Sequence, residues 1–212
     1  MTVDFAGLFL LLAGIPVGVY LAGQVAALPL PDLYSAAQRQ RIQAFGGGAA
    51  GLTCAALAIA SAPPGGQRLL QGLSFILLSL LAWSDLRTRT APLWPAAALA
   101  ILGLTKAYLA LGAIGTGAFA GAGLTMLGFA FALREGFRMI RGHEGMGEAD
   151  PPILAAMACW LGFPAIAWTC AIAAALGLCA QIFLNQRFGP KWPFITLLAL
   201  AATIVSLATF YV

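Results

Sequence analysis

The sequence predicts an all-α polytopic membrane protein with about eight transmembrane helices. Hydrophobic residues make up 61% of the 212-residue chain, charged residues make up 8%, and the mean hydropathy is +0.93. A soluble domain of this size cannot bury so much apolar surface, so we expect lipid to surround most of the chain. Backbone groups in lipid must pair within their own segment, which favours helices of about 20 residues. The length fits a single transmembrane domain over residues 1–212.

Polar or proline-containing breaks divide the chain into eight apolar runs. We place them at about 5–28, 44–62, 69–84, 92–111, 113–133 and 152–162, with a seventh ending near 184 and an eighth at about 192–212. Pro164 follows the sixth run, which is too short to span unless it tilts or the bilayer thins. The pairs Gly47-x-x-x-Gly51 and Gly117-x-x-x-Gly121 predict close packing of helix backbones at those positions.

The distribution of basic residues predicts the orientation. With the N-terminus outside, the loops that become cytoplasmic hold nine basic residues: Arg39, Arg41, Arg87, Arg89, Arg134, Arg138, Arg141, Arg187 and Lys191. The opposite side keeps Arg68, while Lys106 lies within a predicted helix and can extend its amine to the interface. Asp85 and Asp150 then fall on the same face of the membrane, the cytoplasmic one.

Two of the seven acidic residues stand directly at the ends of apolar runs. Asp85 follows LLSLLAWS without a polar spacer, and Asp150 immediately precedes PPILAAMACWLG. Two carboxyls brought together at such a boundary share a proton, because like charges at close range cannot both ionise cheaply. The ionised carboxyl can then activate water while the neutral one polarises a peptide carbonyl. Carboxylates that cap helices or pair with arginines suit the same positions, so spacing alone leaves both interpretations open.

Other hydrolytic chemistries lack the residues they need. The sole histidine, His143, is followed by Glu144 but by no second histidine, so an HExxH metal site is absent. Ser74 has no intramembrane histidine to serve as its base. The four cysteines form no CxxC pair and predict neither disulfides nor zinc: Cys54, Cys159, Cys170 and Cys179. We expect no metal and no cofactor.

The two aspartate segments resemble those of the type IV prepilin peptidases, membrane aspartic proteases of the GxGD type. The first family pattern, D-L-x-x-x-x-x-P, matches residues 85–92. The second, E-G-M-G-x-G-D followed by A-A and W-L-G, matches residues 144–150, 155–156 and 160–162. These flanking matches put the second aspartate at Asp150, not at Glu148. A weaker similarity lies in the proline and phenylalanine at positions 193–194, before the last helix.

The chain departs from the family pattern in three places. Ala149 stands where the second glycine of GxGD is expected, and Pro151-Pro152 replaces the lysine that usually follows the aspartate. Many bacterial members also carry a large first loop with a zinc-binding cysteine tetrad and N-methyltransferase activity. Here that loop is about 30–43 and contains no cysteine, so the resemblance implies a short, peptidase-only form.

The resemblance implies an aspartic endopeptidase of the bacterial inner membrane. It would remove leader peptides from type IV prepilins or pseudopilins at the cytoplasmic face, with Asp85 and Asp150 as the catalytic pair. Glu144 and Glu148 are candidates to bind the basic leader, and Gly147 would let a substrate strand approach the backbone. The alternative for the two glutamates is a solvated loop.

A rival interpretation is a catalytically degenerate scaffold that acts as a binding or assembly partner, and it rests on Ala149 and Pro151-Pro152. The expected partners are a leader peptide and the lipid bilayer. Nucleic acid is not expected, because the basic residues lie in short loops. The pilin cleaved, the pilus or secretion system served and the oligomeric state stay open.

Overall fold

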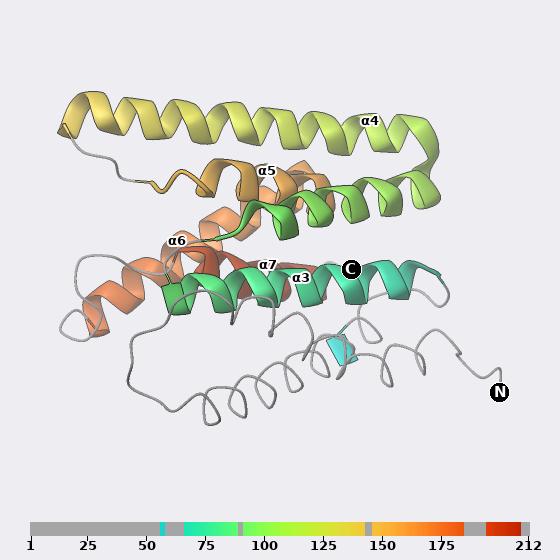
Figure 1. Cartoon of the computed structure of the whole chain (residues 1–212), viewed down its shortest axis with the longest axis horizontal. Coiled ribbons are helices and arrows are strands. Elements are labelled where there is room, and N and C mark those ends of the chain that lie inside the picture. Colours follow the sequence, from blue (N-terminus) through green and yellow to red (C-terminus); the bar gives the residue numbers. More distant parts are fainter. Residues whose placement is uncertain (1–55, 58–65, 89–90, 143–145, 185–193, 209–212) are drawn as a thin grey trace.

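The computed structural model describes residues 56–57, 66–88, 91–142, 146–184 and 194–208 (Figure 1). Its elements are α3 (Gly66–Thr88), α4 (Leu93–Arg141), α5 (Asp150–Leu161), α6 (Phe163–Leu184) and α7 (Phe194–Ala208). No strand occurs within these ranges, which confirms the all-α class for this part of the chain. The first predicted run and most of the second lie outside the described residues. The total of about eight transmembrane helices therefore stays a prediction.

Helix α4 is a hairpin with two legs, which Figure 1 shows running in opposite directions. The reversal occurs at Gly112, whose backbone has φ 68° and ψ −161°, a conformation that residues with a side chain rarely adopt. The two legs match the predicted runs at 92–111 and 113–133, although the second leg continues as helix to Arg141. Gly142 ends it with φ 70°, donating its N–H to the Arg138 carbonyl at 2.9 Å.

Among the described helices, only α4 is long and apolar enough to cross a membrane. Shorter apolar stretches occur within α6 and α7, at Phe163–Cys179 and Phe194–Ser206. Helix α5 has 12 residues, as the short sixth run predicted. At 1.5 Å per residue it is about 18 Å long, well below the roughly 30 Å of a hydrocarbon core. It therefore does not cross a membrane by itself.

Helix α5 packs against both legs of the α4 hairpin. A Cβ built on Gly103, in the first leg, would lie 2.5 Å from Trp160 Cα and 2.6 Å from the Cys159 carbonyl oxygen. A Cβ on Gly123, in the second leg, would lie 3.2 Å from the Ala155 carbonyl oxygen. The absence of a side chain at these two glycines thus sets how closely α4 and α5 approach.

The predicted close packing at Gly117 and Gly121 is wrong. Both glycines are exposed, and a Cβ at either position would meet nothing within 4 Å. The face of α4 that meets α5 is instead the one carrying Gly123. Gly47 and Gly51 lie outside the described residues.

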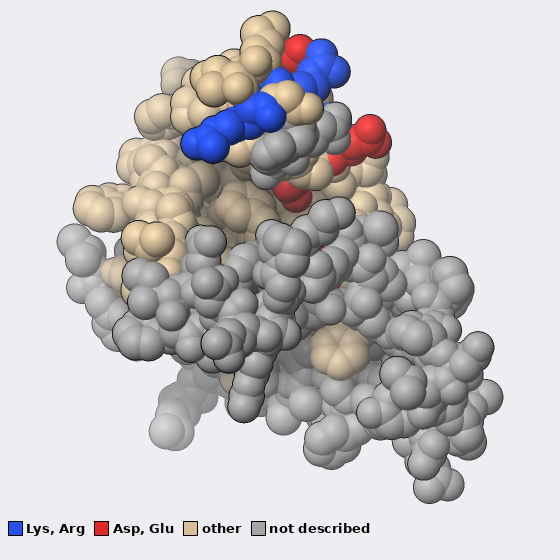
Figure 2. Space-filling model, turned by 90° about the vertical axis from the view of Figure 1, so that its left-hand side faces the viewer, with Lys and Arg blue, Asp and Glu red and all other residues tan. Residues whose placement is uncertain are grey.

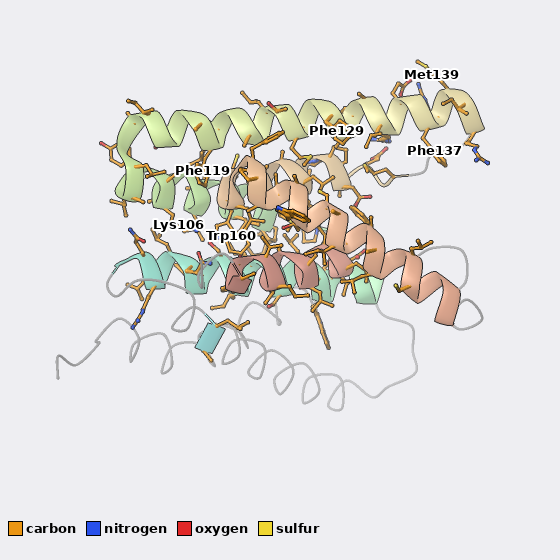
Figure 3. All side chains as sticks on the ribbon, turned by 180° about the vertical axis from the view of Figure 1, so that it is seen from behind. Lys106, Phe119, Phe129, Phe137, Met139 and Trp160 are labelled. Atoms are coloured by element: carbon orange, nitrogen blue, oxygen red, sulfur yellow. The ribbon has the colours of Figure 1, made fainter. Side chains whose placement is uncertain are left out.

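The core lies between the α4–α5 layer and the layer formed by α3 and α7 (Figures 1 and 3). Trp160 of α5 is its largest fully buried side chain, and its ring meets Phe75 of α3 edge-on with 5.4 Å between centroids. Helix α6 follows α5 after a break at Gly162, where φ is 79°. Pro164 lies in the first turn of α6, where its missing N–H breaks no helical hydrogen bond. This arrangement brings the end of α3 near the starts of α5 and α7.

Candidate active site

Asp85 lies in the last turn of α3 and is buried, with 7% of its surface exposed. Its Oδ2 accepts a hydrogen bond from the backbone N–H of Thr196 at 3.1 Å. Thr196 lies in the first turn of α7, where N–H groups have no carbonyl partner within their own helix. Asp85 therefore satisfies a free donor of a helix that lies more than a hundred residues later in the sequence.

Asp150 is the first residue of α5 and is part-buried. Its Oδ2 accepts the backbone N–H of Gly147 at 2.8 Å, and its own N–H donates to the Gly147 carbonyl at 3.3 Å. These two bonds close a turn that leads into the helix. Pro151 and Pro152 follow in the first turn of α5. N–H groups in the first turn make no hydrogen bond within the helix, so proline removes none there. The replacement of the expected lysine is thus compatible with a regular helix start.

The environment of Asp150 favours its protonated form. Burial raises the pKa of this carboxyl above its ordinary value, and the hydrogen bond from Gly147 opposes the shift. The charge of Asp85 raises the pKa of Asp150 further, while Arg134 of α4 opposes it. Asp85 and Asp150 therefore lie close enough for one charge to act on the other, although they come from different helices.

The remaining predicted site residues border Asp150 or fall outside the described ranges. Gly147 contacts the carboxylate directly, and a Cβ there would lie 3.3 Å from Asp150 Oδ2. The side chain of Glu148 is 88% exposed, with its Oε1 3.8 Å from a guanidinium nitrogen of Arg134, a separation typical of weak surface pairs. Glu144 is not among the described residues. Gly147 and Asp150 are in contact and the charge of Asp85 acts on Asp150, whereas Glu148 faces solvent.

Basic and acidic side chains gather at this end of the molecule. Figure 2 looks onto this end and shows them beside the end of α4. Arg138 and Glu135 form an ion pair on the last turns of α4, and Arg141 is exposed. Over the residues that the structure describes, no group of three His, Cys, Asp or Glu side chains could hold a metal ion.

Thr196 is a site residue that the sequence did not reveal. Only the weak similarity at positions 193–194 pointed to the start of the last helix, and no spacing rule relates Thr196 to Asp85. Lys106, by contrast, does not extend outward as predicted. Its Nζ donates to Gln71 Oε1 at 3.1 Å and lies 5.7 Å from the centroid of the Trp160 ring. Gln71 is about 20 Å along α3 from Asp85, so this cluster lies outside the candidate site.

Together, the fold and the site define a helical protein that pairs an apolar hairpin of membrane-spanning length with two interacting carboxyls at one end of the bundle. The sequence profile of the type IV leader peptidase family matches residues 72–207. The chain belongs to this family, which confirms the resemblance found in the aspartate segments. The matched region includes Asp85, Asp150 and Thr196. Neither a curated protein nor a solved structure matches the chain.

Proposed function

We propose that this chain is an aspartic endopeptidase of the bacterial inner membrane that removes leader peptides from type IV prepilins or pseudopilins at the cytoplasmic face. The proposal rests on the placement of Asp85 in the last turn of α3 and Asp150 at the start of α5, where the charge of Asp85 raises the pKa of Asp150. Both lie in the region that matches the leader peptidase family.

The surroundings of the two carboxyls favour different roles. Asp85 accepts an N–H from the first turn of α7, and such a bond at a helix N-terminus stabilises a carboxylate. Burial raises the pKa of Asp150, so this carboxyl holds a proton over a wider pH range than a solvated aspartate. Asp85 is therefore proposed as the general base and Asp150 as the general acid.

In the proposed reaction, Asp85 takes a proton from a water molecule whose oxygen attacks the carbonyl carbon of the scissile peptide bond. Asp150 gives its proton to the carbonyl oxygen, which yields a tetrahedral diol. The diol returns a proton to Asp150 as its carbonyl re-forms, Asp85 protonates the leaving nitrogen, and the C–N bond breaks. Both carboxyls end in their starting states, and no covalent intermediate or metal is required.

The proposed leader-binding residues lie beside this pair. Glu148 is open to solvent at the end of the bundle, where a basic leader can reach it in competition with Arg134. Glu144 is proposed for the same role from its place in the sequence. Gly147 presents no side chain toward Asp150, and this leaves room for a peptide strand next to the carboxyl.

The test is processing of a co-expressed prepilin with a basic leader ending in glycine, read as a gel shift. Asp85→Asn and Asp150→Asn should each reduce cleavage by about 10²–10⁴-fold. The double variant should be hardly worse, because members of one catalytic unit are not additive. Glu135→Gln, an acidic residue of α4 outside the proposed catalytic and leader-binding residues, is the matched control and should keep most activity. Normal processing by Asp150→Asn would refute the assignment, and an inactive wild-type chain would favour the degenerate scaffold.

A further inference from the structure

Thr196 contacts two residues of the last turns of α3. Its backbone N–H donates to Asp85 Oδ2 at 3.1 Å, and its Oγ1 lies 3.1 Å from the Ala82 carbonyl oxygen and 3.4 Å from Asp85 Oδ2. A hydroxyl has a single proton to donate, and the shorter distance assigns it to Ala82. The backbone N–H is then the group of Thr196 that donates to the Asp85 carboxylate.

These two bonds fix one helix end against another. Ala82 and Asp85 are three residues apart and therefore lie on the same face of α3. The threonine hydroxyl bonds the start of α7 to this face, and the adjacent N–H is thereby aimed at the carboxylate. Ile195 and Leu198, on either side of Thr196, are buried at 3% and 0% exposure, so the first turn of α7 is also packed into the core.

We propose that Thr196 is a positioning residue for peptide cleavage, whose hydroxyl fixes α7 on α3 so that its N–H holds the Asp85 carboxylate in the orientation needed to activate water. The inference rests on the proposed peptidase function. Thr196 does not touch the substrate and acts only through Asp85. Catalytic groups must be held to within a fraction of an ångström, and a displacement of about 1 Å can lower the rate by 10²-fold.

Thr196→Val is the decisive variant, because valine keeps the shape and the backbone N–H but removes the hydroxyl. The buried contacts around α7 remain, so the fold should persist. In purified chain with prepilin as substrate, kcat should fall by about 10- to 100-fold while KM stays within about twofold. Thr196→Ser restores the hydroxyl and should recover most of kcat.

Thr203→Val is the matched control in the same helix. The Thr203 hydroxyl bonds to the Ala199 carbonyl of α7 itself at 2.9 Å, so this variant loses a hydroxyl without affecting α3. It should cleave like wild type. Full kcat in Thr196→Val, equal losses in the two valine variants, or a loss that serine does not restore would overturn the inference. A wild-type chain that leaves the leader intact would instead refute the proposed function, and the positioning role with it.

Discussion

The close approach of α4 and α5 at Gly103 gives a quantitative prediction for Gly103→Ala. The new methyl group would lie 2.5 Å from Trp160 Cα and 2.7 Å from Trp160 N, and ordinary contact begins at 3.4 Å. The clashing atoms are backbone atoms of α5, so no side-chain rotation relieves the overlap. The two helices must therefore separate by about 1 Å, and overpacking of this kind costs about 1–3 kcal/mol.

The separation should also affect the site, because Trp160 and Asp150 belong to the same 12-residue helix. If α5 moves as a unit, Asp150 shifts relative to Asp85 by a similar distance, which can lower kcat by about 10²-fold. Gly121→Ala is the matched control, since a Cβ there meets nothing within 4 Å. Replacing glycine by alanine raises helix propensity by roughly the same amount in both variants, at most about 1 kcal/mol. The difference in their free energies of unfolding therefore reports the clash at Gly103.

The assay is thermal unfolding in detergent, together with leader cleavage by the same preparations. Gly103→Ala should be less stable than Gly121→Ala by about 1–3 kcal/mol and should cleave more slowly. Equal stability and equal cleavage in the two variants would refute the close packing of α5 against the first leg of α4.

The protonation of Asp150, the bond between Lys106 and Gln71, and the membrane orientation can each be tested separately. Burial raises the pKa of Asp150 above its ordinary value of 3.8. Between these two pKa values the folded state binds more protons than the unfolded state, so the stability of the wild-type chain falls as pH rises through this window. Asp150→Asn should remove this loss of stability with rising pH, and the variant should melt at a higher temperature than wild type at pH 7. If melting curves of the variant from pH 4 to 8 still show the loss, the prediction is wrong. Lys106→Met should be less stable than the double variant Gln71→Leu/Lys106→Met. The single change leaves the Gln71 amide, which is buried at 5% exposure, without its hydrogen-bond partner. If the double variant melts at the lower temperature, the contact between Lys106 and Gln71 is contradicted. Cysteines placed at Arg68 and Arg141 in a cysteine-free background should label from opposite sides of the membrane, with Arg141 cytoplasmic, and labelling from one side would exclude the proposed orientation.

The helices and the candidate carboxyls could be predicted from the amino-acid sequence alone. Apolar runs separated by polar breaks predicted α3, both legs of α4 and the short α5, because helix formation in lipid depends on the hydropathy of adjacent residues. The same local pattern marked Asp85 and Asp150 as carboxyls without a polar spacer. The flanking segments, residues 85–92 and 144–162, were enough to recognise the family that the profile match confirms.

Which helix faces meet could not be predicted in this way, because it depends on how the whole bundle packs. The glycine spacing at residues 117–121 was visible in the sequence, but small residues do not specify their partner, and the contacts with α5 form at Gly103 and Gly123 instead. The bond from Thr196 to Asp85 joins residues 111 positions apart, and no local periodicity encodes such a pair. It exists because the start of α7 packs against the end of α3, an outcome of the packing of the whole bundle.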